Sequence, residues 1–186
     1  MVLTLLLVDI QNDYFPGGKK ELYNIEKAAK NSEKILMYFR ENNLPVIHVK
    51  HISTRKGASF FLPDSYGSEI NIIVNPLSSE KVVVKNSPNS FLNTDLLEIL
   101  RQKNTLELVI CGAMSNMCID ASARAASDAG FVCTVISDAC AAGSLEFEGI
   151  KIPAEIVHAA FMAALSGIYA KVKDTDCFLE GRKSIS

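Results

Sequence analysis

Short apolar runs that alternate with helical patterns constrain the fold of this chain more than any other feature of its sequence. The runs are rich in Val, Ile and Leu, which is typical of strands buried on both faces of a parallel sheet. They cover residues 3–8, 46–49, 81–84, 106–111 and 131–136. This alternation predicts a doubly wound α/β fold, with helices on both faces of the sheet.

Four helical patterns occupy the intervals between and after these runs. An amphipathic pattern covers residues 24–42, and a shorter one begins at Thr94, whose hydroxyl suits an N-cap. A third pattern covers residues 116–129. The fourth covers residues 153–170 and places Pro153 in its first turn, where a residue without an N–H is tolerated.

One segment, residues 53–76, departs from this alternation. It carries Gly57, Pro63, Gly67 and Pro76 among aromatic residues. Structureless loops of this length are uncommon in compact domains and are usually functional. We therefore expect a structured excursion that forms a lid over a pocket or an oligomer contact. Because no repeat, low-complexity tract or Gly/Ser linker interrupts the chain, we expect one domain over residues 1–186.

The composition excludes several classes of partner. The 186 residues include 19 Lys and Arg against 21 Asp and Glu, for a formal net charge of −2, and no basic run stands out. We therefore expect neither nucleic acid nor an anionic membrane as the main partner, but a small molecule. The apolar stretch at the N-terminus spans only seven residues and has no basic leader, which predicts neither a signal peptide nor a membrane span.

The cysteines indicate the compartment. Their number is odd, they show no CxxC spacing, and several lie in apolar runs, so a disulfide framework is not expected. They are Cys111, Cys118, Cys133, Cys140 and Cys177. We therefore predict a reducing, cytoplasmic location.

Three residues with suitable chemistry follow apolar runs. Ligands bind beyond the carboxyl ends of the strands in open α/β sheets, and Asp9, Lys85 and Cys118 are expected at that edge. The helical pattern places Cys118 in a first helical turn, where the helix dipole and the Lys85 ammonium would favour the thiolate. Free N–H groups in the same turn could bind a developing oxyanion.

Each of these residues also has a purely structural interpretation. Asp9 could be a turn residue, Lys85 a solvated strand end, and Cys118 a small buried hydrophobe, as we assume for Cys111, Cys133 and Cys140. The joint placement of an acid, a base and a thiol at strand ends favours an active site.

The motifs around these residues resemble those of the isochorismatase-like cysteine hydrolase superfamily. That superfamily includes nicotinamidases, N-carbamoylsarcosine amidases, ureidoacrylate and biuret hydrolases, and isochorismatase. The resemblance covers nearly the whole chain. It runs through LVDIQNDY at residues 7–14, Lys85 with NSF at 89–91, CGAMSNMC at 111–118, the helix at 121–126 and SDACA at 137–141.

The resemblance implies a six-stranded parallel sheet, with a last strand near residues 170–173, and assembly into homo-oligomers, a dimer or a tetramer. It implies that Asp9 is the general base and later the acid, that Lys85 supports the ionised groups, and that Cys118 attacks a carbonyl to give a thioester. It further implies a cis peptide between Ala113 and Met114, and an oxyanion hole formed by the N–H groups of Met114 and Cys118.

Two departures from the family pattern limit what can be transferred. Nicotinamidases hold a metal through an Asp-x-His pattern and further histidines, whereas this chain has His48 and His51 and then only His158. We therefore expect no metal and no other cofactor, with His48 and His51 packed at a strand end and His51 able to face the pocket. Isochorismatase itself cleaves a vinyl ether without a cysteine nucleophile, so Cys118 favours C–N bond hydrolysis.

These inferences predict a cysteine amidohydrolase for a small amide, carbamoyl or ureido compound. The candidate pocket residues are Gln11, Tyr14, His51, Phe61 and Phe91. Two alternatives stay open: vinyl ether hydrolysis of the isochorismatase type, and a non-catalytic redox sensor in which Cys118 has a low pKa and is accessible.

Overall fold

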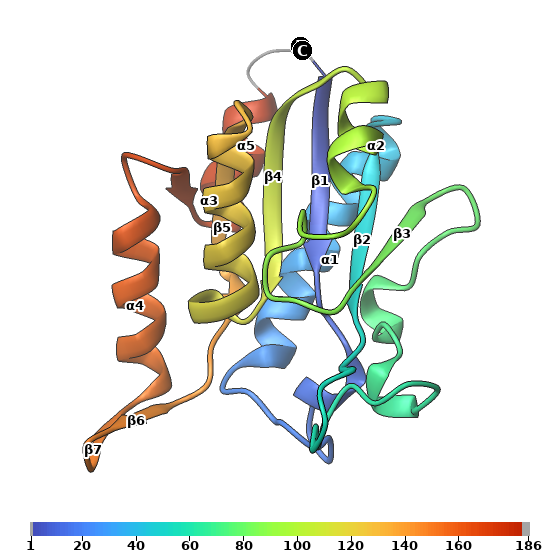
Figure 1. Ribbon diagram of the computed structural model, residues 1–186. Helices are drawn as coiled ribbons and strands as arrows, with labels where there is room; N and C mark the ends of the chain where they lie inside the picture. The colour runs from blue at the N-terminus through green and yellow to red at the C-terminus, as the bar shows by residue number, and fades with distance from the viewer. Residues whose placement is uncertain (1, 184–186) are drawn as a thin grey trace.

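The computed structural model describes residues 2–183 and contains a six-stranded, fully parallel sheet between two layers of helices (Figure 1). The strand order is β3-β2-β1-β4-β5-β8. The strands are β1 (Val2–Val8), β2 (Val46–His51), β3 (Lys81–Lys85), β4 (Thr105–Ala113), β5 (Val132–Ala141) and β8 (Lys171–Lys173). The doubly wound α/β fold and the six-stranded sheet are therefore confirmed.

The helices divide between the two faces of the sheet. Helices α1 (Ile25–Glu41) and α5 (Thr175–Lys183) cover one face, where Phe39 and Phe178 pack into one apolar cluster with Leu5 and Leu7. Helices α2 (Leu96–Gln102), α3 (Asp120–Asp128) and α4 (Ala154–Leu165) contribute to the cluster on the other face, where Leu6 and Val8 point. Successive residues of β1 thus enter opposite cores, which explains its unbroken apolar sequence.

The strand order reverses between β1 and β4. From β1 the chain proceeds outward to β2 and β3, and from β4 it proceeds in the other direction to β5 and β8. The connections therefore diverge at the carboxyl ends of β1 and β4, the place where ligands bind in this kind of sheet. Asp9 follows β1 directly, and Cys118 lies five residues after the end of β4.

Four predictions about the elements need correction. The fourth helix ends at Leu165 rather than at residue 170, because Ser166 is extended and Gly167 adopts a φ of +86°. The N-cap position of α2 is Asp95 rather than Thr94, whose hydroxyl donates to the carbonyl oxygen of Ser90 at 2.6 Å and accepts the N–H of Leu96, the first residue of α2, at 3.4 Å.

The third correction concerns strand β3. It lies at the edge of the sheet, and Val82 and Val84 are 37% and 54% exposed, so it is not buried on both faces. The third predicted helix begins differently as well: a π-helical turn, η4 (Ser115–Ile119), precedes α3.

The sequence pattern did not reveal the antiparallel hairpin of β6 (Leu145–Phe147) and β7 (Ile150–Ile152), or helix α5. The excursion at residues 53–76 is structured, as expected, with two 3₁₀ turns, η2 (Tyr66–Ser68) and η3 (Ile72–Val74). No helix within residues 2–183 combines the length and the apolar character that crossing a membrane requires.

Candidate active site

The structure brings Asp9, Lys85 and Cys118 together, although they come from three segments of the chain. The ammonium Nζ of Lys85 lies 2.8 Å from Asp9 Oδ2 and 3.2 Å from Cys118 Sγ. None of the three side chains reaches open solvent: Asp9 is 0%, Lys85 1% and Cys118 5% exposed. An acid, an ammonium and a thiol are therefore in contact at the point where the strand order reverses.

Lys85 has two further partners, both of them neutral. Its Nζ lies 3.0 Å from His51 Nδ1 and 3.0 Å from the carbonyl oxygen of Ser87. Burial lowers the pKa of Lys85, but the Asp9 carboxylate and the Cys118 sulfur raise it, and the net shift is upward. The Lys85 side chain is therefore a permanent cation, fixed in place by the groups around it.

The backbone of Asp9 is shaped to point its carboxylate at this cluster. Asp9 adopts a φ of +53°, in the left-handed region that residues with a side chain avoid, and its N–H donates to the carbonyl oxygen of Val49 at 3.0 Å. The neighbouring strand approaches closely at Gly112, where any Cβ would clash with the carbonyl oxygen of Val8. A glycine at this position lets the ends of β1 and β4 meet.

Cys118 lies inside the π-helical turn rather than in the first turn of an α-helix, since α3 begins two residues later. The Ala113–Met114 peptide that precedes this turn is cis, as the resemblance implied. The carbonyl oxygen of Met114 accepts hydrogen bonds from the N–H groups of Met117 and Ile119, at 3.0 and 3.1 Å. Single π-helical turns occur frequently at functional sites.

The surroundings of Cys118 oppose a resting thiolate. Burial is the largest influence and raises the pKa of the Cys118 thiol, and the Asp9 carboxylate raises it further, while Lys85 lowers it. The net shift is strongly upward. The expectation of a low pKa, drawn from a helix N-terminus and a nearby cation, is therefore corrected, because it left out the burial of the sulfur and the carboxylate beside it.

The other cysteines divide into two kinds. Cys111, Cys133 and Cys140 are buried in the core, and burial raises the pKa of Cys133 and of Cys140 to about 12, which fits the interpretation as small hydrophobes. Cys177 on α5 is exposed. Among the described cysteines, only Cys118 is placed against both a carboxylate and an ammonium.

A cavity of about 280 Å³ opens above Cys118. Three of the proposed pocket residues line it, namely Tyr14, His51 and Phe61. The rings of Tyr14 and Phe61 meet edge to face with centroids 4.6 Å apart, and the rings of His51 and Phe61 are 5.9 Å apart. These three side chains form a continuous wall beside the thiol.

The other two proposed pocket residues lie elsewhere. The side chain of Gln11 is fully buried and does not line the cavity, because its amide bonds the backbone N–H of His51 at 2.8 Å and the His51 carbonyl oxygen at 2.9 Å. Gln11 thus holds the backbone that carries His51. Phe91 packs near Phe131 on the second core cluster, with ring centroids 6.4 Å apart.

The excursion supplies lining residues that sequence reasoning did not single out. They are Ser53, Thr54, Arg55, Gly57, Ala58, Ser59 and Phe60. The length and irregularity of the segment predicted a lid, but the pattern did not show which of its side chains would face the thiol. Pro88, Met114 and Met117 complete this side of the cavity together with Asn86.

The side chains in this site that could together bind a metal ion surround the Lys85 ammonium, which is already positively charged. One ligand atom from each of Asp9, His51 and Cys118 lies within 4.8 Å of the other two. The Lys85 ammonium, however, is 2.8, 3.0 and 3.2 Å from these same side chains. A divalent ion among them would lie against the ammonium and be repelled by it, so this donor set does not fit a metal.

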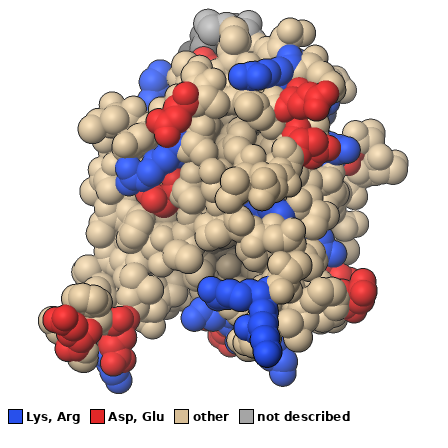
Figure 2. Space-filling model, viewed as in Figure 1, with Lys and Arg blue, Asp and Glu red and all other residues tan. Residues whose placement is uncertain are grey.

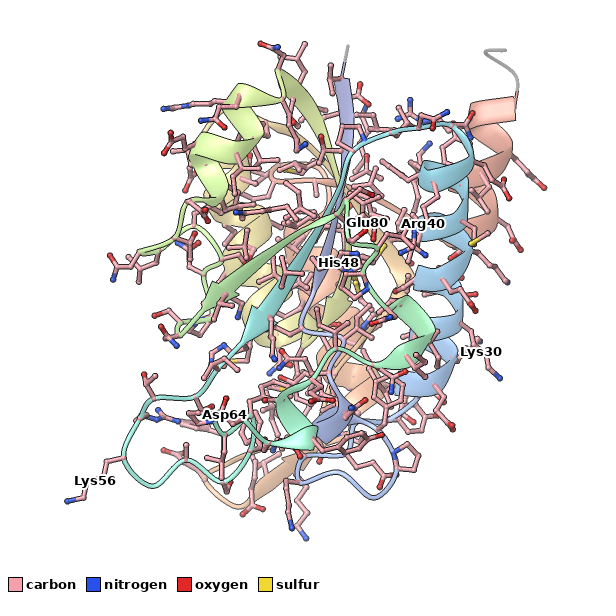
Figure 3. All side chains as sticks on the ribbon, turned by 90° about the vertical axis from the view of Figure 1, so that its right-hand side faces the viewer. Lys30, Arg40, His48, Lys56, Asp64 and Glu80 are labelled. Atoms are coloured by element: carbon pink, nitrogen blue, oxygen red, sulfur yellow. The ribbon has the colours of Figure 1, made fainter. Side chains whose placement is uncertain are left out.

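His48 of β2 belongs to a separate cluster with Arg40 of α1 and Glu80, which directly precedes β3 (Figure 3). Its Nε2 lies 2.9 Å from Glu80 Oε2, and Glu80 accepts two hydrogen bonds from Arg40, each 2.8 Å long. His48 is 1% exposed. The expected packing role of His48 at its strand therefore fits these contacts, and His48 takes no part in the cluster around Cys118.

Comparisons with known proteins agree in the family they indicate. The model of the isochorismatase domain matches residues 4–175. An uncharacterized isochorismatase family protein of Bacillus subtilis (strain 168) is 53% identical over 180 residues, which are 97% of this chain and 100% of that protein. A crystal structure of an isochorismatase hydrolase from Oleispira antarctica has a TM-score of 0.93 and 48% identity, with 96% of each chain covered. Streptothricin hydrolase of Streptomyces noursei is 29% identical over 67% of this chain and 48% of its own length.

Proposed function

We propose that this chain, which belongs to the isochorismatase family and is a hydrolase of that family, cleaves a C–N bond in a small amide, carbamoyl or ureido substrate through a thioester on Cys118. The observation that carries the proposal is the contact of Lys85 with both Asp9 and Cys118 under a cavity. A nucleophile, a proton acceptor and a fixed positive charge are the groups that acyl transfer through a thiol requires.

The first step is attack by the Cys118 thiol. Because the pKa of this thiol is raised, the sulfur is protonated at rest and must lose its proton as it reacts. Asp9 is the base within reach, and its Oδ1 has no hydrogen-bond partner among the described residues. Sγ forms a bond to the substrate carbonyl carbon while its proton passes to Asp9, and Lys85 stays charged throughout.

The tetrahedral adduct then collapses. We propose that the backbone N–H groups of Met114 and Cys118, both of which line the cavity, bind its oxyanion. Asp9 returns the proton to the leaving nitrogen as the C–N bond breaks. Water next attacks the thioester and gives a proton to Asp9, which passes it to the sulfur when the acid product is released.

The two alternatives from the sequence are less well supported. A redox sensor needs an accessible thiol of low pKa, whereas burial and Asp9 raise the pKa of Cys118. Vinyl ether hydrolysis needs no thiol, yet Cys118 forms part of the cavity lining. The streptothricin hydrolase among the relatives supports hydrolysis of a small molecule but names no substrate for this chain.

The decisive experiment is to trap the acyl adduct. Purified protein is first screened for ammonia release from a panel of small amides, carbamoyl compounds and ureides, and the slowest substrate is then used in quenched reactions for mass spectrometry. We expect an acyl mass on Cys118, no turnover in Cys118→Ser, and full turnover in the matched control Cys177→Ser. If Cys118→Ser keeps a near-normal rate and no adduct forms, the vinyl ether reaction becomes the better proposal.

We also propose that the protein acts in the cytoplasm and assembles as a homo-oligomer, a dimer or a tetramer. Apolar side chains on α4 and on the β6–β7 hairpin support assembly, because Ile156, Phe147 and Ile150 are 59%, 68% and 66% exposed. Exposed apolar groups mark contact surfaces where they form one contiguous patch. Sedimentation velocity tests the proposal, and a wild-type protein that stays monomeric at high micromolar concentration would contradict it.

A further inference from the structure

The cavity above Cys118 is asymmetric in charge. Among residues 2–183, no aspartate or glutamate lines it, and Arg55 is the one lysine or arginine that does. His51 also lines it, but burial and Lys85 lower its pKa, so its ring is neutral at neutral pH. Asp9 and Lys85 neutralise one another beneath the floor. The lining therefore carries a positive charge that no lining group compensates.

Arg55 has no acidic partner in the part of the chain that the structure describes. Arg40, Arg124 and Arg182 each lie within 2.9 Å of a carboxylate oxygen, whereas Arg55, like Arg101, forms no ion pair, and its side chain is exposed. The guanidinium has five donors in a planar fork that fits a carboxylate, and here those donors are free to bind a ligand.

The loop that carries Arg55 is fixed at its base. The N–H of Ser53 donates to the carbonyl oxygen of Phe61 at 2.8 Å, and the N–H of Phe61 donates to the buried Asp13 carboxylate at 2.6 Å. Within the loop, the N–H of Ala58 donates to the carbonyl oxygen of Arg55 at 3.1 Å. Arg55 is thus held at the rim of the cavity by the same contacts that place Phe61 in its wall.

The cavity therefore has three parts, which follow one another from its floor to its rim. Cys118 is at the floor, the rings of Tyr14, Phe60 and Phe61 form an apolar wall, and Arg55 lies at the rim. Figure 2 shows Lys and Arg side chains gathered at the lower middle of this face, where the loop after β2 lies. A molecule with its carbonyl at the thiol would extend along the aromatic wall toward the arginine.

We propose that the substrate carries a carboxylate at the end remote from the scissile carbonyl, and that Arg55 binds this carboxylate. The proposal rests on the proposed function, since it identifies the class of compound that the same cavity hydrolyses. A guanidinium–carboxylate pair orients the substrate as well as attracting it, because two parallel N–H donors fix the plane of the carboxylate.

The test uses alkylating probes, so it does not depend on knowing the substrate. N-iodoacetylglycine carries a carboxylate beyond its reactive carbon, and N-iodoacetylglycinamide is its neutral counterpart of nearly equal size. The rate of Cys118 alkylation by each probe is followed by mass spectrometry of the native protein, with Cys177 as an exposed reference thiol. We expect the anionic probe to react roughly five- to tenfold faster than the neutral one at Cys118, as an exposed but aligned ion pair allows.

Two variants show whether Arg55 is responsible. Arg55→Gln should abolish the preference for the anionic probe, and Arg55→Lys should keep part of it. Lys56→Gln is the matched control, because Lys56 is the next residue, has the same charge, does not line the cavity and points away from the protein in Figure 3. The control should keep the preference.

The outcomes separate this inference from the proposed function. Equal rates for the two probes in the wild type, or an equal loss of preference in Lys56→Gln and Arg55→Gln, would overturn the carboxylate site. A clear preference that depends on Arg55, in a protein that hydrolyses no amide or ureide, would leave the anion site standing and refute the proposed reaction instead.

Discussion

The ammonium of Lys85 and the carboxylate of Asp9 form an ion pair 2.8 Å long in which neither side chain is exposed to solvent. Burying two charges costs more than their attraction returns unless further groups satisfy them. Lys85 has such groups in His51, Ser87 and Cys118, whereas Asp9 Oδ1 has no partner among the described residues. The carboxylate is therefore the incompletely satisfied member of the pair, which suits the role of proton acceptor that we propose for it.

Replacing Asp9 separates catalysis from thiol reactivity. In Asp9→Asn we expect turnover to fall by about 10² to 10⁴, because the group that accepts and returns the proton is gone. We expect alkylation of Cys118 by iodoacetamide at neutral pH to become faster, because the carboxylate charge that raises the pKa of this thiol is removed while Lys85 remains. The two rates are measured on one preparation, with Cys177 as internal reference. A parallel loss of both would indicate damage to the site instead.

Removing the lysine should destabilise the fold. Lys85→Met leaves the Asp9 carboxylate buried without its cation, and we expect the free energy of unfolding to fall by about 3 to 5 kcal/mol in urea titrations. The double variant Asp9→Asn, Lys85→Met should recover a large part of this loss.

A matched control for Lys85→Met exists at the other end of β3. Lys81 faces Asp95 at 3.7 Å, and both side chains are about half exposed. Lys81→Met should therefore change the free energy of unfolding by less than about 1 kcal/mol. Similar losses for the two lysines would mean that the Lys85–Asp9 pair contributes no more than a surface pair.

The local sequence pattern was enough to predict five of the six strands of the sheet, and only the family resemblance implied β8. Apolar runs rich in Val, Ile and Leu, interrupted by amphipathic stretches, predicted five strands and helix α1 with end residues within two positions of those observed, except that β5 continues to Ala141 rather than ending at residue 136. The burial of β3 could not be predicted in this way, because its position at the edge depends on strand order. The end of α4 was also missed, because an extended Ser166 and a left-handed Gly167 stop a helix whose apolar pattern continues.

The candidate site was predictable in its members but not in its electrostatics. Asp9, Lys85 and Cys118 were expected to meet because each follows a strand of the same parallel sheet. The pKa of Cys118 depends on how deeply the sulfur is buried and on how the Asp9 carboxylate lies relative to it. The spacing of these residues along the sequence determines neither. Gln11 was predicted to line the pocket, yet it holds the backbone of His51.

Chelation should leave activity unchanged. The Lys85 ammonium lies between the side chains that could hold a metal, so we expect the proposed reaction to require no bound cation at this place. Turnover after dialysis against EDTA should equal that of untreated protein. Activity lost on dialysis and restored by zinc or manganese would contradict this, and His51→Gln would then show whether His51 is a ligand.

Acid should weaken the contact of Glu80 with Arg40 and His48, which ties α1 and β2 to the segment before β3 (Figure 3). Burial alone raises the pKa of Glu80, but hydrogen bonds from Arg40, from the N–H of Leu77 and from His48 outweigh this and lower it to about 2. A carboxylate with a lowered pKa stabilises the folded state above its unfolded pKa, and this contribution disappears as pH falls toward the folded value.

The pH dependence of stability tests this contact directly. We expect the Glu80 contribution, at most about 3 kcal/mol for a shift of this size, to be complete at neutral pH and to be lost as the pH falls from about 4.5 to about 2. Glu80→Gln should therefore be less stable than the wild type at pH 7 and approach it near pH 2, in urea titrations at each pH. Glu26→Gln, at an exposed position of α1, is the control and should follow the wild-type curve. The plots of unfolding free energy against pH for Glu80→Gln and the wild type could instead run parallel across this range. In that case Glu80 does not titrate between these pH values, and its hydrogen bonds from Arg40 and His48 do not determine the acid stability of the fold.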